Sequence, residues 1–341
     1  MIRPALAAVA AALLADGKGL LAIDESNATC DRRFAAAGIP QTLQMRRAWR
    51  ELLLTAPGLG DFISGVILYD ETLGQSTADG TPFVAVARAA GLAVGIKVDI
   101  GAKPLAAHPG EQVTEGLDGL RLRLLAYAAR GACFAKWRAV FTVATASPSG
   151  IEANAHALAR YAALCQEAGL VPIVEPELLM DGDHPLARGG ELAEVVLRGV
   201  FAQLAQQRVQ LEAMILKPAM VLAGSECAEQ PGVAAIAEAT LRCLRRSVPA
   251  AVPGIAFLSG GQAGAEATAR LNAMHAGAGA GGAALPWRLS FSFGRALQQP
   301  ALSIWAGDDR QRVAAQQALL HRARCNAAAL RGRYQAAMED R

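Results

Sequence analysis

Two kinds of segment alternate along this chain, and the alternation is the feature that most constrains its fold. About eight apolar runs of strand length alternate with longer runs that are rich in alanine and arginine and have helical character. The strand-like runs are Gly19 to Asp24, Ser64 to Asp70, Leu92 to Asp99, Ala132 to Val140, Leu170 to Glu177, Leu211 to Lys217, Gly254 to Ser259 and Leu289 to Arg295. The helical candidates include Leu43 to Leu54, Val113 to Ala129, Glu152 to Ala168, Gly190 to Gln207, Val233 to Arg246, Ala263 to Ala276 and Arg310 to Tyr334.

The alternation predicts a (β/α)₈ TIM barrel. Successive units recur at roughly 30 to 45 residues, and continuous apolar strands suit a parallel sheet that is covered on both faces. No linker or change in composition divides the 341 residues. The alanine-rich start resembles a secretory leader, but it runs straight into the first strand, so a helix ending at Gly17 explains it better. We expect an α/β fold in which residues 1–341 form a single barrel domain, with that N-terminal helix and a short C-terminal helical tail.

An open, doubly wound sheet is the alternative fold, and it predicts a glycine-rich turn directly after an early strand. The formal GxGxxG match runs from Gly277 to Gly282, where it precedes a strand and does not open a helix. We therefore interpret it as a flexible connection without a ligand.

Composition excludes several classes of function. The net charge is +3 with the basic residues scattered, which argues against a nucleic-acid surface, and no run is long enough to span a membrane. The six cysteines are dispersed without a CxxC pair, which indicates reduced thiols in a cytoplasmic protein. The histidines are isolated, so we expect no bound metal. They are His108, His156, His184, His275 and His321.

Charged residues gather where the strand-like runs end. In a TIM barrel the active site lies at the carboxyl ends of the strands, so these residues are catalytic candidates. They are Asp24 with Glu25 and Ser26, Lys97 with Asp99, Lys136 with Arg138, Glu175 with Glu177, and Lys217. Residues two apart on a strand share a face, so Lys136 with Arg138 and Glu175 with Glu177 form same-side pairs.

Lys217 near the end of an apolar run has two interpretations. It is either a surface lysine with a buried stem or a reactive neutral amine, because burying an ammonium group is costly. A lysine whose pKa falls from about 10.4 to about 7.4 is neutral roughly a thousand times more often at pH 7. The charges at the strand ends could be ion pairs that fill the barrel mouth. Together, however, two lysines with neighbouring carboxyl groups suit amine chemistry on a carbonyl.

The last two strands point to a phosphate. Ser259 and Gly260 follow the seventh strand, and Gly294 and Arg295 follow the eighth. Loops at these two places form the common phosphate site of such barrels. Arg32 and Arg33 with Lys97 could hold a second anion, although two adjacent arginines on a helix are often only solvated.

At this point the sequence resembles the class I (Schiff-base) fructose-1,6-bisphosphate aldolases. The similar segments occur in the family's order and extend from about residue 10 to 335. They are Gly17 to Ser26, Gly95 to Asp99, Phe134 to Arg138, Val171 to Glu177, Leu216 to Met220, Phe257 to Gln262 and Phe291 to Ala296.

The resemblance implies roles for individual residues. Lys217 would form the Schiff base with the C2 ketone of fructose 1,6-bisphosphate, and Glu175 would be the acid/base. Lys136 would favour the neutral form of Lys217, Asp24 would hold the reacting hydroxyl, and Glu177 would support the lysines. Ser259, Gly260, Gly294 and Arg295 would bind the C1 phosphate. Ser26, Arg32, Arg33 and Lys97 would bind the C6 phosphate end, with Arg138 close by. No cofactor or metal is needed, and the family is usually homotetrameric.

Three departures from the family keep alternatives open. Arg32-Arg33 replaces the Lys-Arg of animal members, and Phe293 stands where a tyrosine is common. The sequence also ends at Arg341, without the tyrosine-ended tail that assists proton exchange in animal members. A preference for another sugar phosphate and a secondary scaffold role are therefore the alternatives to cleavage of the bisphosphate in glycolysis and gluconeogenesis.

Overall fold

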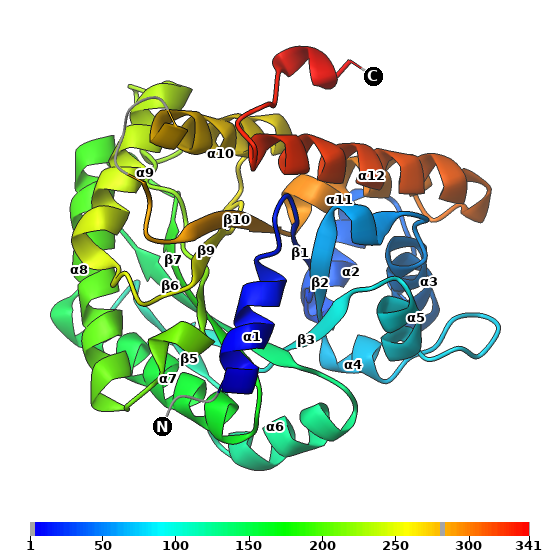
Figure 1. Ribbon diagram of the computed structural model, residues 1–341, viewed down its shortest axis with the longest axis horizontal. Helices are drawn as coiled ribbons and strands as arrows, with labels where there is room; N and C mark the ends of the chain where they lie inside the picture. Colours follow the sequence, from blue (N-terminus) through cyan, green and yellow to red (C-terminus); the bar gives the residue numbers. More distant parts are fainter. Residues whose placement is uncertain (1–3, 280–283, 341) are drawn as a thin grey trace.

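The protein forms a closed barrel of parallel strands with helices around it (Figure 1). The computed structural model describes residues 4–279 and 284–340. Around the barrel the strands follow the order β1-β10-β9-β8-β7-β6-β3-β2, and the last strand pairs with the first. Their bounds are β1 (Gly19–Ile23), β2 (Ile63–Leu68), β3 (Ala93–Lys97), β6 (Phe134–Thr142), β7 (Val171–Leu179), β8 (Ile215–Leu216), β9 (Gly254–Phe257) and β10 (Arg288–Phe293). The predicted (β/α)₈ barrel is confirmed, and the open sheet is excluded.

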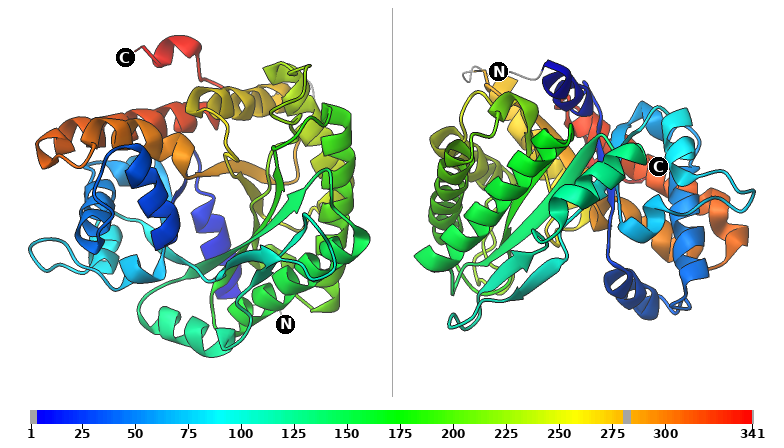
Figure 2. Two further views of the ribbon diagram at one scale, coloured as in Figure 1. Left: turned by 180° about the vertical axis from the view of Figure 1, so that it is seen from behind. Right: turned by 90° about the horizontal axis from the view of Figure 1, so that it is seen from below.

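Most helices form a ring outside the barrel, as the views from behind and below also show (Figure 2). They are α1 (Pro4–Leu13), α2 (Asn27–Ala36), α3 (Leu43–Leu54), α4 (Asp70–Leu73), α5 (Phe83–Ala89), α6 (Leu120–Ala129), α7 (Pro148–Glu167), α8 (Leu186–Gln206), α9 (Val233–Ser247), α10 (Gly264–Gly279), α11 (Arg295–Trp305) and α12 (Arg312–Ala329). None of the helices in the described ranges is long and apolar enough to cross a membrane. The division into domains stays a prediction.

Helix α1 is the exception to the ring, because it lies over one end of the barrel (Figure 1). It contacts the short helix η2 (Leu211–Ala213), which leads into β8, so it covers the amino ends of the strands. Leu6, Ala10 and Leu13 pack there against buried residues of the barrel strands. The helix ends at Leu13, and Gly17, predicted as its end, lies in the following turn with a φ of 69°. This apolar plug leaves the carboxyl ends as the open face.

A second apolar layer lies between the strands and the outer helices. Trp49 of α3 stacks on Trp305 of α11 with ring centroids 5.3 Å apart, and Phe34 of α2 lies 6.1 Å from Trp305. All three side chains are fully buried, and burial of a large apolar side chain stabilises the fold by about 1.5–3 kcal/mol. This packing holds α2 and α11 beside each other, and these helices follow the first and last strands of the barrel.

The predicted helix from Val113 to Ala129 is wrong in its first part. Residues Gln112–Glu115 form β5, which pairs antiparallel with β4 (Gly101–Pro104). Gly116 and Gly119 have φ values of 128° and 66°, a backbone conformation that a continuing helix cannot contain. Helix α6 therefore begins only at Leu120.

Other predicted segments differ at their boundaries. The sixth predicted strand, Leu211 to Lys217, is regular only at Ile215–Leu216, because its first residues form η2 and Pro218 has no N–H group. The final predicted helix is α12, with the short helix η3 (Asp309–Gln311) before it and η4 (Ala336–Met338) in the segment after it. The GxGxxG match overlaps the end of α10, and its residues 280–282 lie outside the described residues. The six cysteines are free thiols, as predicted.

Candidate active site

The carboxyl ends of the strands surround an open cavity of about 1610 Å³. Every predicted site residue lines this cavity. These residues are Asp24, Ser26, Arg32, Arg33, Lys97, Lys136, Arg138, Glu175, Glu177, Lys217, Ser259, Gly260, Gly294 and Arg295. The structure thus brings together residues that come from nearly the whole length of the chain. The catalytic or binding role of each one stays a prediction.

Four buried charges form a continuous chain at the base of the cavity. Lys217 Nζ lies 3.0 Å from Glu175 Oε1, and Lys136 Nζ lies 2.9 Å from Glu175 Oε2. Lys136 Nζ also lies 2.7 Å from Asp24 Oδ2. Each of these residues is at most 8% exposed. Lys217 is therefore not a surface lysine with only its stem buried, and each ammonium group is neutralised by a carboxylate that water hardly reaches.

The register of the parallel strands sets this arrangement. Lys136 of β6 is level with Lys97 of β3, and Arg138 is level with Glu175 of β7. Lys217 directly follows β8, and its N–H donates to the carbonyl of Val174 at 2.8 Å, so the residue is still held by the sheet. The side chains of neighbouring strand ends consequently meet over the barrel axis.

The electrostatic balance at Asp24, Glu175 and Lys136 favours the charged forms of these three groups. Burial alone would raise the pKa of Asp24, but the ammonium groups of Lys136 and Lys217 outweigh burial and lower this pKa to about 2. Burial opposes ionisation of Glu175 as well, and the same two lysines lower its pKa. Burial would lower the pKa of Lys136, whereas Asp24 and Glu175 raise it. Lys136 is therefore a fixed positive charge between two carboxylates.

Glu177 lies beyond this chain and pairs with an arginine. Arg138 Nε is 2.5 Å from Glu177 Oε2, and the arginine side chain is 40% exposed to the cavity while the carboxylate is 9% exposed. The resemblance assigned Glu177 to support of the lysines. The interaction seen here is with Arg138, and the pair forms part of the cavity wall.

Helix α2 begins at the cavity and carries three of the predicted phosphate ligands. Ser26 caps the helix, because its Oγ accepts a hydrogen bond from Thr29 N. Arg32 is exposed and donates to Thr29 Oγ1 at 3.2 Å. Arg33 instead contacts the carboxylate of Glu25 and donates to a glutamine of α11 at 2.8 Å. The two adjacent arginines therefore differ, since within the described ranges only Arg33 has an ion-pair partner.

The loops after β9 and β10 form the part of the wall beside α2, because β10 pairs with β1. Gly260 and Gly261 have φ values of 52° and 89°, so this turn requires residues without a side chain. Gly294 precedes the first residue of α11, Arg295. The two loops lie together, because a Cβ on Gly261 would be 3.6 Å from Arg295 Nη2. Backbone N–H groups at a helix start beside an arginine are suited to a phosphate dianion.

Comparison with known proteins shows which family this chain belongs to. The family model described as "Fructose-bisphosphate aldolase class-I" matches residues 5–341 of the chain. The chain belongs to the class-I fructose-bisphosphate aldolase family. This agrees with the resemblance in the strand-end motifs, whose residues meet in one cavity.

Individual relatives match over nearly the whole chain. A probable fructose-bisphosphate aldolase class 1 from Xanthomonas campestris pv. campestris is 54% identical over 332 residues, covering 96% of this chain and 98% of the relative. The chloroplastic fructose-bisphosphate aldolase 3 of Arabidopsis thaliana is 50% identical, covering 98% and 84%. The structure of fructose-bisphosphate aldolase from Plasmodium falciparum, in complex with TRAP and a small-molecule inhibitor, superposes with a TM-score of 0.94 at 42% identity, covering 98% and 96%.

Phe293 does not contribute to the cavity of this family member. Its side chain in β10 is fully buried and lies 5.5 Å from the ring of Phe291, and it is not among the cavity-lining residues. Phe293 therefore belongs to the buried apolar core and not to the cavity wall.

Two of the strand-end candidates, Asp99 and Glu25, were given no individual role from the sequence. Asp99 is buried and contacts Lys97. Glu25 is held by Arg50 at 2.9 Å and by Gln298 Nε2 at 2.9 Å. Gln298 gives no local signal, because it lies within a helix and reaches Glu25 only through the closure of the barrel.

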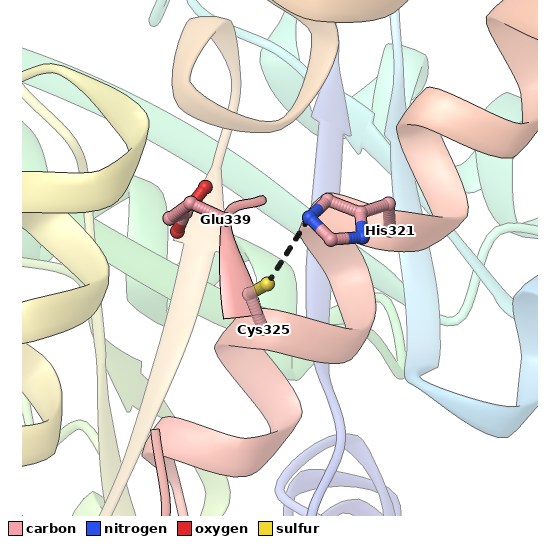
Figure 3. Close-up of side chains that lie close together, drawn as sticks. All are labelled: His321, Cys325 and Glu339. Atoms are coloured by element: carbon pink, nitrogen blue, oxygen red, sulfur yellow. Dashed lines mark hydrogen bonds between the residues drawn. The ribbon is translucent and has the colours of Figure 1, made fainter. Parts of the chain in front are cut away.

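A group of possible metal ligands lies away from the cavity, at α12 and the C-terminal segment (Figure 3). His321 Nε2 is 3.6 Å from Cys325 Sγ, one helical turn away, and Glu339 completes the group. The carboxylate of Glu339 already contacts the guanidinium of Arg322 and accepts a hydrogen bond from Tyr334 Oη at 2.7 Å. A cation at this place would be opposed by the arginine. We interpret the group as an anchor for the C-terminal segment.

Proposed function

We propose that this chain catalyses the reversible cleavage of fructose 1,6-bisphosphate to dihydroxyacetone phosphate and glyceraldehyde 3-phosphate through a Schiff base on Lys217. One observation carries the proposal. Lys217, Glu175, Lys136 and Asp24 form an unbroken buried chain of charges at the mouth of a class-I aldolase barrel. The proposal places the chain among the carbon–carbon lyases that act in glycolysis and gluconeogenesis.

The first stage forms the iminium. Glu175 takes a proton from the Lys217 ammonium group, the neutral amine attacks C2 of the ketose, and Glu175 then returns the proton to the carbinolamine hydroxyl, which leaves as water. Glu175 Oε1 lies 3.0 Å from Lys217 Nζ, within the distance for direct proton transfer to and from this centre. Lys136 holds the other oxygen of the same carboxylate, which keeps Glu175 oriented toward Lys217.

The second stage breaks the carbon–carbon bond. Glu175 accepts the proton of the C4 hydroxyl, the C3–C4 bond breaks, and its electron pair moves into the protonated imine to give an enamine. Glyceraldehyde 3-phosphate leaves. Protonation of the enamine at C3 and hydrolysis of the iminium then release dihydroxyacetone phosphate and restore Lys217. Asp24, whose pKa is lowered to about 2, stays ionised and accepts hydrogen bonds from substrate hydroxyl groups beside Lys136.

The two ends of the substrate are assigned to two parts of the cavity wall. Ser259, Gly260, Gly294 and Arg295 receive the C1 phosphate, because a glycine turn and the start of α11 meet there. Ser26, Arg32, Arg33 and Lys97 receive the C6 phosphate end, with Arg138 and its partner Glu177 in the wall between. No cofactor is required by this scheme, since the iminium itself accepts the electrons.

Borohydride trapping tests the proposal directly. Wild type is mixed with fructose 1,6-bisphosphate and sodium borohydride in excess EDTA, and the intact mass is measured. We expect one stable adduct that maps to Lys217 and is absent from Lys217→Ala. Lys103→Ala is the matched control, because Lys103 is an exposed lysine of β4 and should leave the adduct unchanged. An adduct that persists in Lys217→Ala would refute the assignment.

A preference for another sugar phosphate is the second candidate, and Arg32 is the observation that favours it. This side chain is exposed in the wall assigned to the C6 phosphate, and its guanidinium differs in shape from the lysine of animal members. Specificity constants for several sugar phosphates decide the matter. Similar values would support this candidate, and a strong preference for the bisphosphate would remove it.

We further propose that the chain is a single-domain protein that assembles as a homo-oligomer in the cytoplasm. The support is its membership in a family that is usually homotetrameric. Sedimentation equilibrium tests the assembly, and a monomer at micromolar concentration would contradict it. A single cooperative unfolding transition that follows the assembly state would support one domain.

A further inference from the structure

Asp99 is a buried carboxylate at the cavity that the proposed reaction does not use. It lies two residues after the end of β3, and its side chain is 2% exposed. Lys97 Nζ lies 2.6 Å from Asp99 Oδ1 and donates to the backbone carbonyl of Asp99 at 2.9 Å. An ammonium group has three donors, so Asp99 occupies two of them. The third remains for a ligand in the cavity that Lys97 lines.

The carboxylate of Asp99 is itself held from other elements. Oδ1 accepts a hydrogen bond from the N–H of Gly101, the first residue of β4, at 3.2 Å. Oδ2 accepts one from the N–H of Arg138 in β6, also at 3.2 Å. A buried carboxylate with backbone donors on both oxygens cannot rotate without losing one of these bonds. The position of Lys97 is therefore fixed by the backbone through Asp99.

Tyr69 lies on another side of the same ammonium group. The centroid of its ring is 6.0 Å from Lys97 Nζ, at the outer limit for a cation–π contact. A lysine side chain without such partners samples many rotamers. Here the side chain is only 14% exposed. Its charge is held between a ring and a carboxylate, at the wall assigned to the C6 phosphate.

We propose that Asp99 is a positioning residue that orients the ammonium group of Lys97 toward the distal phosphate of the sugar. The inference rests on the proposed function, in which Lys97 receives that phosphate. Asp99 does not contact the substrate and acts through Lys97. The third N–H of the Lys97 ammonium group does not bond to Asp99 and can donate to the phosphate. The phosphate therefore binds without breaking the ion pair between Lys97 and Asp99. The proposal requires the orienting effect to exceed the repulsion between the carboxylate and the phosphate.

The test compares two substrates that differ only in the distal phosphate. Values of kcat/KM are measured for fructose 1,6-bisphosphate and fructose 1-phosphate with wild type, Asp99→Asn, Lys97→Met and the double variant. Asp99→Asn should lower the preference for the bisphosphate about tenfold, mainly through KM, as expected for loss of one charge-assisted hydrogen bond. In the Lys97→Met background the same change should leave the preference unaltered, because the two residues act as one unit.

A second variant separates position from charge and covers the case in which Asp99→Asn does not fold. Asp99→Glu keeps the charge but moves the carboxylate by one methylene group, and it should show the same loss of preference. An unchanged preference in this variant would overturn the inference. So would an equal loss for both substrates, which would show that Asp99 only supports the β4–β5 hairpin. Tighter binding of the bisphosphate by Asp99→Asn would overturn it as well.

The proposed function is checked separately in the same samples. Each Asp99 variant should still form the borohydride adduct on Lys217, because Asp99 does not contact Lys217 or Glu175. If wild type forms no adduct, the Schiff-base mechanism is refuted. A normal adduct with an unaltered substrate preference in the variants would refute only the role of Asp99.

Discussion

Asp24→Asn tests whether the buried chain of charges is ionised in the folded protein. Asp24 is 8% exposed and lies 2.7 Å from Lys136 Nζ. Its pKa is lowered from 3.8 to about 2. This difference corresponds to about 2 kcal/mol of stability at neutral pH. The asparagine variant has the same shape but cannot carry the charge, so it should lose about this amount at pH 7.

The sign of the pH dependence follows from the direction of the pKa change. A carboxyl group whose pKa is lower in the folded state stabilises the protein fully above its unfolded pKa. The contribution of Asp24 is therefore complete above about pH 5 and is lost as the pH falls toward about 2, with roughly half of it gone at pH 3. The stability difference between wild type and Asp24→Asn should become smaller across this range.

The measurement is urea unfolding followed by tryptophan fluorescence at several pH values between 7 and 3, with reversibility checked by dilution. Taking the difference between the two proteins cancels the titration of all other groups. The exposed Asp61 provides the control, since Asp61→Asn should give no comparable change with pH. A difference of about 2 kcal/mol that stays constant from pH 7 to pH 3 would refute the assigned ionisation of Asp24.

Two further predictions address catalysis and packing. Glu175→Gln keeps the shape of the side chain but removes the proton carrier, so kcat should fall about 10²–10⁴-fold; a loss below tenfold in a coupled assay would contradict its role. Gly95→Ala places a Cβ 2.1 Å from the ring of Phe134 and should destabilise the fold by about 1–3 kcal/mol or more. Gly277→Ala, in a helix with open space around the site, should instead stabilise it slightly, as urea midpoints will show.

The cavity was predictable because barrel topology converts sequence position into spatial position. Polar residues at the ends of parallel strands must lie at one end of the barrel, whatever the loops between them do. The sequence alone therefore placed Lys136 and Glu175 on neighbouring strand ends, and the distance of 2.9 Å between Lys136 Nζ and Glu175 Oε2 agrees. The same rule marked Asp99, two residues after the end of β3, as a strand-end candidate, although it gave that residue no role.

Other contacts were not predictable from local patterns. Strand β5 was interpreted as the start of a helix, although Gly116 and Gly119 break the chain before α6 begins. Gln298 donates to Glu25 across a separation of 273 residues, and this contact exists only because the last strand pairs with the first. The choice of partner by Glu177 depends on side-chain rotamers, which the sequence does not specify.

A comparison of the two ends of the barrel shows why the buried charges are better explained by catalysis than by folding stability. At the amino end the interior is filled by apolar side chains and closed by α1, including Leu6 and Leu13. The carboxyl end contains Lys217, Lys136 and Glu175 at 4% exposure or less. Replacing buried ion pairs with apolar residues is often neutral or stabilising, so folding does not require them. Because the carboxylates that neutralise the lysines are also the groups placed to move protons, stability and reactivity at this end depend on the same contacts.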